Sequence, residues 1–426
     1  MGRTLAEKII ARAAGRSSVE PGEIVTCKVD LAMVHDSSGP RRHKAMLNQL
    51  GAKPWDVSRI VVVTDHYVPA FDADSAAILD LTRKWVRDEG VANFYDMQGI
   101  CHVILPERGH LRPGIFAVGG DSHSPMAGAW GCFMFGIGAT EMCGVLVTGD
   151  IWLKVPPTHQ VRWAGRLGEG LAAKDIMLTL CREMGLGTVR YGVVEYVGPA
   201  IAALSMPERM VLTNMSAELG AQTGLIAPDQ TTVEALAAAG VIVSDALSWQ
   251  SDADAAFAKV WDFDASRLEP QVAAPHSPEN AAPVGDYPGV KIDQCYIGAC
   301  TGAKLDDLRM AASILRGRTV ARGTRLLVAP ASQRILAAAA ADGTLAALTA
   351  AGAILMPSGC GACAGYGAGV LAEGEVCLSS TARNFKGRMG HPGSSVYLGS
   401  PYTVAASAVT GRITDPRPQL AEKVAA

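Results

Sequence analysis

Short apolar runs recur along the chain, and each leads into a polar or glycine-rich turn. Stretches with helical periodicity, such as residues 74–90 and 332–352, lie between them. Buried strands that alternate with helices predict repeated βα units, and therefore an α/β fold with parallel sheets flanked by helices. The strand-like runs are RIVVVTDH (59–66), GIFAVGGDSH (114–123), VRYGVVEYVG (189–198), KIDQCYIGAC (291–300), TRLLVAP (324–330) and GAILMPSGC (352–360).

Several of these runs end in residues that can carry chemistry. Asp65 and His66 close one run, and the segment 121–123 (Asp-Ser-His) closes another. Cys300 and Cys360 stand in the same position after two later runs. In parallel sheets the functional groups gather beyond the carboxyl ends of the strands, so we expect these side chains at such edges.

The chain is long enough to need more than one hydrophobic core. At 426 residues it exceeds what a single core usually supports. Two segments interrupt the pattern: KVPPTHQ (154–160) carries paired prolines, and residues 270–289 are rich in Pro, Ala and Gly. Cuts near 155 and 275 predict three α/β domains, at 1–155, 156–275 and 276–426.

Composition and charge exclude several classes of protein. The apolar fraction of 49% and charged fraction of 19% fit a soluble enzyme, and the net charge of −3 disfavours nucleic acid as a partner. No apolar run could span a bilayer, and the first 15 residues suggest an amphipathic helix and not a signal peptide. We therefore expect a cytoplasmic protein whose ten cysteines are reduced.

Cys360 and Cys363 form a Cys-x-x-Cys pair within SGCGACAG. This spacing lets two thiolates reach one metal centre, and the flanking glycines let backbone amides approach it closely. The pair alone is ambiguous, because the same spacing serves zinc sites, redox pairs and simple packing. No second close pair that would complete a structural zinc site stands nearby.

Cys300 favours an iron–sulfur cluster, because it should reach the same sheet edge as Cys360. Three converging thiolates suit a [4Fe–4S] cluster in which one iron lacks a cysteine and can act as a Lewis acid. The alternative is that Cys300 is a small core residue. Packing is the favoured interpretation for the other seven cysteines, which are Cys27, Cys101, Cys132, Cys143, Cys181, Cys295 and Cys377.

With the cysteines in place, the chain resembles the aconitase superfamily, and within it the large subunits of 3-isopropylmalate dehydratase and related alkylmalate hydro-lyases. The resemblance runs from about residue 5 to the end and rests on motifs in the family's order. They are VDLAMVHDSSGP (29–40), TDHYVP (64–69), GICHVILPERG (99–109), GGDSHSPMAGAWGCFMFGIGATEM (119–142), NMSAELGAQTGLIAPD (214–229), YIGACTGAKLDDLRMAA (296–312), PSGCGACAG (357–365) and STARNFKGR (380–388).

The resemblance implies a three-domain aconitase-like architecture with a [4Fe–4S] cluster at the domain junction. Its ligands would be Cys300, Cys360 and Cys363. The implied catalytic residues around the cluster and the departing hydroxyl group are Asp65, His66, His102, Asp121, His123 and Glu218. The implied substrate-binding residues are Ser122, Asn214, Arg383 and Arg388.

The resemblance also implies a partner. Single-chain aconitases carry a further swivelling domain, which this sequence lacks, so we expect a small swivel-domain subunit in a heterodimer or heterotetramer. The expected substrate is a small malate-like hydroxy-acid: 3-isopropylmalate, another alkylmalate or maleate.

The residue types suit this chemistry apart from the resemblance. Loss of hydroxide needs an acid for the leaving oxygen, a base for the C–H bond and cations for the carboxylates. Imidazoles beside carboxylates, as in Asp65–His66, can be tuned toward neutral pH. Arginines five residues apart, at 383 and 388, can each fork onto carboxylate oxygens. Taken alone, such an arginine pair is more often a solvated face and an Asp-Ser-His turn more often closes a loop.

Three positions depart from the family pattern, and one of them, Ser124 where threonine is common, is a mild change. Gly302 and Ala382 stand where relatives usually carry asparagine, so two amide groups near the cluster are lost. The leading hypothesis is a [4Fe–4S]-dependent hydro-lyase. The alternatives are a family lyase with a divergent substrate or leaving group, a non-catalytic RNA-binding regulator, and a structural zinc protein.

Overall fold

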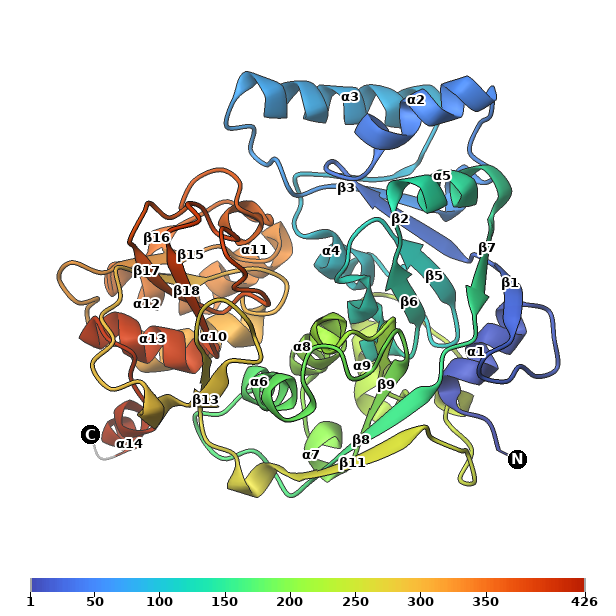
Figure 1. Cartoon of the computed structure of the whole chain (residues 1–426). Coiled ribbons are helices and arrows are strands. Elements are labelled where there is room, and N and C mark those ends of the chain that lie inside the picture. The colour runs from blue at the N-terminus through green and yellow to red at the C-terminus, as the bar shows by residue number, and fades with distance from the viewer. Residues whose placement is uncertain (1, 425–426) are drawn as a thin grey trace. The chain divides into compact units, whose positions relative to one another are not determined.

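The computed structural model describes residues 2–424 and divides them into two compact units (Figure 1). The first unit comprises residues 2–97, 101–164 and 187–263. The second comprises residues 98–100, 165–186 and 264–424. The chain thus passes between the units several times, so neither unit is one continuous stretch of sequence.

The first unit contains a five-stranded parallel sheet in the order β4-β3-β2-β5-β6. Its central strands are fully buried, as their apolar runs predict. Figure 1 shows α2, α3 and α5 along one side of this sheet, and α1 contacts β5 and β6. The elements are α1 (Leu5–Ala13), β2 (Leu31–His35), α2 (Pro40–Leu50), η1 (Val57–Arg59), β3 (Ile60–Thr64), α3 (Ala73–Glu89), β4 (Asn93–Asp96), α4 (Cys101–Glu107), β5 (Phe116–Gly119), β6 (Phe133–Gly136) and α5 (Ala139–Thr148).

A second sheet in this unit has the order β10-β9-β8-β11, and β1 forms an antiparallel ribbon with β7. The helix α8 packs against η2, where the Thr213 hydroxyl donates to the Met126 carbonyl oxygen at 3.0 Å. The elements are β1 (Ile24–Lys28), η2 (Ser124–Trp130), β7 (Asp150–Lys154), β8 (Thr158–Ala164), β9 (Val193–Val197), α7 (Pro199–Ala202), α8 (Met206–Met215), η3 (Ser216–Leu219), β10 (Thr223–Leu225), α9 (Gln230–Ala238), η4 (Ala246–Ser248) and β11 (Lys259–Asp264).

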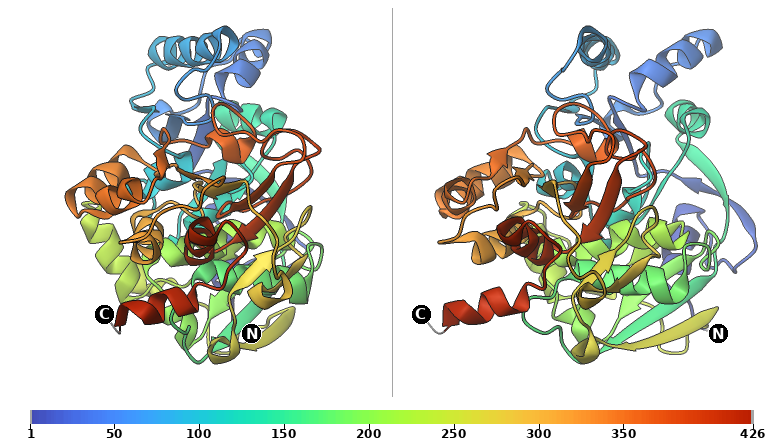
Figure 2. Two further views of the ribbon diagram at one scale, coloured as in Figure 1. Left: turned by 90° about the vertical axis from the view of Figure 1, so that its left-hand side faces the viewer. Right: turned by 60° about the vertical axis from the view of Figure 1, so that its left-hand side comes forward.

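The second unit is built on a seven-stranded sheet in the order β13-β12-β18-β17-β14-β15-β16. The five strands from β18 to β16 are parallel, and β12 adds antiparallel to β18. The neighbouring strands β17 and β18 lie side by side in both further views (Figure 2). The strands are β12 (Gln271–Ala273), β13 (Ala281–Pro283), β14 (Gln294–Ile297), β15 (Arg325–Val328), β16 (Ile354–Leu355), β17 (Val376–Ser379) and β18 (Ser395–Gly399).

The helices of the second unit include α6, which comes from a distant part of the sequence and packs against β12, β13 and β18. The helix α10 contacts α11, α12 and α13. The elements are α6 (Ala173–Met184), η5 (Ala265–Arg267), η6 (Val284–Asp286), α10 (Leu305–Leu315), α11 (Gln333–Ala341), α12 (Thr344–Ala350), η7 (Gly361–Ala364), α13 (Pro401–Thr410) and α14 (Arg417–Val424).

The six predicted strands are all present, although β16 is very short. The prediction of a single helix over 332–352 is wrong in one respect, because this segment forms two helices, α11 and α12. Gly343 takes a left-handed φ of 79° between them, a conformation that ends one helix and is easy for glycine. The segment 270–289 is likewise more than a joint, since β12 and β13 lie within it.

The α/β architecture with helix-flanked parallel sheets is confirmed. The finer division at 155 and 275 stays a prediction. Among the described residues, no helix combines the length and apolar composition that crossing a bilayer requires.

Candidate functional site

Asp65 and His66 lie directly beyond the carboxyl end of β3. The Asp65 Oδ1 is 2.7 Å from His66 Nδ1, and its Oδ2 accepts a hydrogen bond from the Cys101 backbone N–H at 2.7 Å. Burial alone would raise the pKa of the Asp65 carboxyl, but the His66 ring beside it and these hydrogen bonds hold the pKa below its usual range. Asp65 is therefore a carboxylate that orients the His66 ring through its Nδ1 atom.

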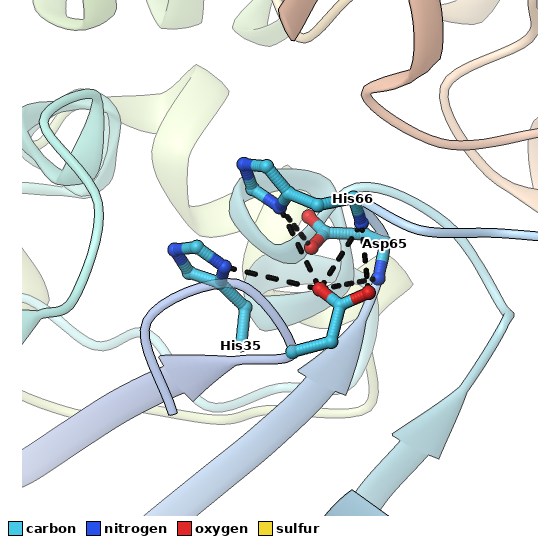
Figure 3. A group of neighbouring side chains, drawn as sticks. His35, Asp65 and His66 are labelled. Carbon is cyan, nitrogen blue, oxygen red and sulfur yellow. Dashed lines mark hydrogen bonds and ion pairs between the residues drawn. The ribbon is translucent and has the colours of Figure 1, made fainter. Parts of the chain in front are cut away.

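His35, at the end of β2, and Asp36, just beyond it, join this pair, although neither is among the predicted site residues. The His35 and His66 rings stack with centroids 4.1 Å apart (Figure 3). The Asp36 carboxylate accepts hydrogen bonds from the backbone N–H groups of His66 and Tyr67, at 3.1 and 2.9 Å. The turn that carries His66 is thus fixed by a buried carboxylate of the neighbouring strand.

The buried pair His35 and Asp36 is electrostatically shifted. Burial, and then the neighbouring His66, lower the pKa of His35 to about 4. Burial and then the negative charge of Asp65 raise the pKa of Asp36. His35 is accordingly a neutral ring that accepts or donates hydrogen bonds, and its Nε2 lies 3.1 Å from the Gly120 carbonyl oxygen.

Asp121 is the centre of a second group, beyond the carboxyl end of β5. Its Oδ1 lies 2.8 Å from His102 Nε2 and accepts the backbone N–H of His123 at 2.7 Å. Burial would raise the pKa of Asp121, but His102, His123 and His35 hold it well below its usual range. The Asp121 Oδ2 also lies 3.8 Å from the Nε2 atoms of His35 and His66, which links the two groups.

Packing of α8 on η2 brings Glu218 to this array. The His123 Nε2 lies 3.3 Å from Glu218 Oε1, and both side chains are buried. Asn214 is also buried, and its Nδ2 contacts the Met126 sulfur at 3.4 Å. Ser122 differs from the others because it is exposed. The structure thus brings the predicted residues Asp65, His66, His102, Asp121, His123 and Glu218 into one array within the first unit.

This array is suited to proton transfer. Each imidazole lies within hydrogen-bond distance or close ion-pair distance of a carboxylate, so protons can be held at defined nitrogen atoms. Two subsets also have metal-ligand character, since their donor atoms lie within 4.8 Å of one another: His35, Asp36, Asp65 and His66, and His102, Asp121 and His123. Their mutual hydrogen bonds already use many of these donor atoms.

The three predicted cluster cysteines lie in the second unit. Cys300 follows β14, while Cys360 and Cys363 flank the start of η7, where the Cys363 N–H donates to the Cys360 carbonyl oxygen at 3.1 Å. Cys300 and Cys363 are buried, and Cys360 is half-buried. Burial raises the pKa of Tyr296, and the thiols of Cys363 and Cys360 add to this effect, while those of Cys300 and Cys363 both act on Lys174. All three therefore occupy one neighbourhood of this unit.

The donor set fits a polynuclear cluster better than one metal ion. Thiolates are soft ligands that iron–sulfur clusters and zinc both take. Ligands on one tetrahedral zinc, at about 2.3 Å from the metal, lie about 3.8 Å apart. Among the described residues, these cysteines do not form a group whose donor atoms all lie within 4.8 Å. A side chain added at Gly361 would meet no atom within 4 Å, so the space beside Cys360 is open.

The other seven cysteines are all buried, in agreement with the packing interpretation. Burial raises the pKa of Cys27 to about 12 and raises those of Cys132, Cys295 and Cys377 further. Thiols of this kind stay protonated at neutral pH and are poor metal ligands.

Arg383 and Arg388 lie between β17 and β18, and both are partly exposed. Between them Asn384 is fully buried, and its Nδ2 donates to the carbonyl oxygens of Ala274 and Val396, at 2.8 and 3.0 Å. These bonds fix the backbone of the loop that carries the arginines. The segment after Cys363 approaches the same loop, because a Cβ at Gly365 would lie 3.0 Å from the Arg388 carbonyl oxygen.

The Gly302 departure has a structural counterpart. A Cβ at this position would lie 2.1 Å from Ser380 Oγ and 2.6 Å from the Ser380 carbonyl oxygen. Ser380 Oγ in turn accepts the Gly298 N–H at 3.1 Å. Ser380 therefore takes the space from which an asparagine side chain at 302 would begin. The second departure, Ala382, is buried.

Comparisons with known proteins place the chain in a family. Residues 7–289 and 285–411 match the aconitase family (aconitate hydratase). The chain is 45% identical to the 3-isopropylmalate dehydratase large subunit 1 of Methanopyrus kandleri, over 99% of this chain and 100% of that protein. It is also 45% identical to the probable methanogen homoaconitase large subunit of Methanosarcina mazei, over 91% of this chain and 98% of the relative.

A solved structure is similar in fold. The crystal structure of aconitase X from Thermococcus kodakaraensis, in its holo form, aligns with a TM-score of 0.50 and 12% sequence identity. The alignment covers 84% of each chain. Given the match of the family over nearly the whole sequence, the chain belongs to the aconitase family of hydro-lyases.

Proposed function

We propose that the chain is the large subunit of a [4Fe–4S]-dependent hydro-lyase that dehydrates or hydrates a malate-like hydroxy-acid. The preferred substrate is 3-isopropylmalate, with other alkylmalates or maleate as variants of the same chemistry. The observation that carries the proposal is the 45% identity to a 3-isopropylmalate dehydratase large subunit along the full length of both chains.

Cys300, Cys360 and Cys363 would hold the cluster. Their thiol chemistry, their common neighbourhood in the second unit and the open space at Gly361 support this assignment. When bound, such a cluster supplies Lewis acidity for the departing hydroxyl group.

The imidazole–carboxylate array would hold and donate the proton that the leaving hydroxyl oxygen requires. Asp121 stays ionised at neutral pH, and its Oδ1 atom lies 2.8 Å from His102 Nε2, so it holds the His102 ring in place for proton transfer. Asp65 does the same for His66.

Two arginines and two uncharged polar residues would bind the substrate. Arg383 and Arg388 would bind the carboxylate groups of the substrate through their forked N–H donors. The buried Asn384 amide fixes the backbone between them, which limits the freedom of both guanidinium groups. Ser122 and Asn214 would donate hydrogen bonds to further substrate oxygens.

We also propose a small-subunit partner, in a heterodimer or heterotetramer. The support is that the similar proteins from Methanopyrus kandleri and Moorella thermoacetica both carry the name "large subunit", and that this chain spans almost all of each. The partner would complete the substrate site, and the chain alone would turn over slowly or not at all.

A second candidate substrate is that of a homoaconitase. The 45% identity to a probable methanogen homoaconitase large subunit equals that to the dehydratase subunit. The filled space at Gly302 favours a site whose shape differs from that of relatives with asparagine there.

The proposal is tested with the full chain, co-expressed with the small subunit from the same genome and reconstituted anaerobically with iron and sulfide. Formation of the unsaturated acid is followed with 3-isopropylmalate and citramalate, and loss of the double bond by hydration is followed with homoaconitate and maleate, each as a separate substrate. We expect turnover of one of them only when cluster and partner are both present. Full turnover by the isolated chain, or none by the loaded complex, would contradict the proposal.

A further inference from the structure

Lys174 is a fully buried lysine near the start of α6, and the proposed chemistry gives it no role. Lys174 is 1% exposed. The helix that carries it, α6, packs against β12, β13 and β18. The ammonium Nζ donates to the Thr301 hydroxyl oxygen at 3.1 Å and to the Thr381 carbonyl oxygen at 3.0 Å. All of these residues belong to the second unit.

The two hydrogen-bond partners lie beside functional positions. Thr301 directly follows Cys300, and Thr381 stands two residues before Arg383. The Thr301 hydroxyl also donates to the Ser380 carbonyl oxygen at 3.0 Å. Lys174 therefore joins the segment of one cysteine to the segment that leads to the arginines. Loss of its ammonium group would free both segments at once.

The ammonium group also lies in the field of the thiols. Burial, and then the charge of Lys304, lower the pKa of Lys174 to about 8, while the thiol groups of Cys300 and Cys363 act in the opposite direction. A Coulomb interaction is mutual, so the cation stabilises negative charge on those sulfur atoms by the same amount. Inside a protein this interaction is screened far less than at the surface.

A second buried lysine in the same region has a different role. The Lys304 Nζ lies 2.7 Å from the Asp307 carboxylate and 3.2 Å from the Cys300 carbonyl oxygen. Its charge is balanced by Asp307, which is equally buried. The Lys174 Nζ donates hydrogen bonds to uncharged oxygen atoms of Thr301 and Thr381. Removing a buried charge from water costs several kcal/mol, which a nearby anion offsets.

We propose that Lys174 is a positioning residue for the cluster, whose ammonium group offsets the negative charge of the thiolate-bound cluster and fixes the Cys300 segment. The inference rests on the proposed function, because it presupposes a cluster on Cys300, Cys360 and Cys363. A positive charge near an iron–sulfur cluster favours its reduced form, so Lys174 should raise the reduction potential.

The test compares Lys174→Gln and Lys174→Met with the unchanged chain. Both variants remove the charge, but Gln keeps an amide that can still donate hydrogen bonds. Lys291→Gln is the matched control, since Lys291 is exposed and precedes β14, whereas Cys300 follows it. The full-length chains are reconstituted anaerobically with ferrous iron and sulfide. Iron, acid-labile sulfide and the cluster's reduction potential are then measured, the potential by a titration followed with electron paramagnetic resonance.

We expect both Lys174 variants to shift the potential to more negative values and the control to leave it unchanged. A tenfold loss in the equilibrium constant for reduction corresponds to about 59 mV for one electron. Folded variants that no longer retain iron also support the inference, because the charge is then needed to hold the cluster. Circular dichroism of the apo chains separates loss of the cluster from loss of the fold.

An unchanged potential in a Lys174→Gln variant that keeps its cluster would overturn the inference and leave Lys174 a structural residue. If the unchanged chain itself takes up no iron and sulfide, the result contradicts the [4Fe–4S] cofactor of the proposed function and not the role of Lys174. The two failures are therefore distinguished by the unchanged chain.

Discussion

Asp36 holds the backbone of His66 in place, since its carboxylate oxygens accept the His66 N–H at 3.1 and 3.2 Å. Asp36→Ala should leave the buried N–H groups of His66 and Tyr67 without this acceptor, at a cost of about 1–3 kcal/mol in the free energy of unfolding. It should also lower turnover by releasing His66. The measurements are urea unfolding and kcat of the loaded complex.

The control for this variant is Asp56→Ala. Asp56 also accepts a backbone N–H, that of Ser58 at 3.0 Å, but it lies at the surface in η1's cap. We expect the control to cost no more than about 1 kcal/mol, as exposed caps do, and to leave kcat unchanged. Equal losses in the two variants would contradict the role given to Asp36.

Asp121→Asn should remove the negative charge that His102 and His123 share. Without it the array loses a carboxylate that supports proton transfer, and we expect kcat to fall by about 10²–10⁴. The fold should persist, because asparagine can still accept the His123 N–H through Oδ1. Activity within tenfold of the unchanged complex would mean that Asp121 does not support proton transfer.

Cys300→Ser should abolish cluster binding, because it removes one of three thiolates. Cys295→Ala is the matched control on β14, where the buried thiol has a raised pKa and no expected ligand role. Iron and sulfide analysis after reconstitution should find little metal in the first variant and an unchanged content in the second. Loss of iron from both would argue for a general effect of changes on this strand.

His43 should make the fold sensitive to acid. It is buried in α2, and burial lowers its pKa to about 4, below the value of about 6.5 expected in the unfolded chain. Between these values the unfolded state binds the proton more tightly, so stability falls as pH falls from about 6.5 toward 4. The contribution approaches about 3 kcal/mol, at 1.36 kcal/mol for each pH unit of difference.

His43→Leu should remove this dependence. Unfolding free energies of the variant and the unchanged chain should converge as pH falls from 7 to 4.5, or the variant should become the more stable one. Parallel curves for the two chains across that range would show that His43 does not titrate as its burial indicates.

Gly302→Ala should destabilise the second unit by about 1–3 kcal/mol, because the added methyl group would overlap Ser380. Ser380→Gly should relieve only part of the loss, since the Ser380 carbonyl oxygen remains 2.6 Å away. Gly144→Ala is the control: it lies within α5 with no atom within 4 Å of a new Cβ, and it should stabilise the helix by about 0.5–1 kcal/mol. Thermal unfolding of the apo chains measures all three.

The sequence predicted the parts of the site that obey a local rule. Asp65 and Asp121 follow apolar runs that become β3 and β5, and parallel strands bring their carboxyl ends to one edge. The run LAMVH (31–35) obeys the same rule, since His35 ends it and Asp36 follows it, but an Asp before Ser-Ser-Gly also fits an ordinary turn. Asp36 acts by accepting the backbone N–H groups of His66 and Tyr67, which follow the neighbouring strand β3, and the sequence alone does not predict this contact.

Lys174 was missed for a different reason. A Lys-Asp pair at the start of a helix is typical of a solvated first turn. Here both residues are buried, because α6 packs against a sheet whose strands all lie beyond residue 264. Such a long-range association has no local signature in the sequence.

The separation of α6 from its sheet has a consequence for synthesis of the protein. The helix leaves the ribosome more than two hundred residues before β18, the strand against which it packs. Until then its apolar residues, such as Ile176 and Leu180, have no completed surface to cover them. The nascent chain must therefore carry this helix through a long interval in which it is open to aggregation or to a chaperone, and the second unit is completed only with its last strands.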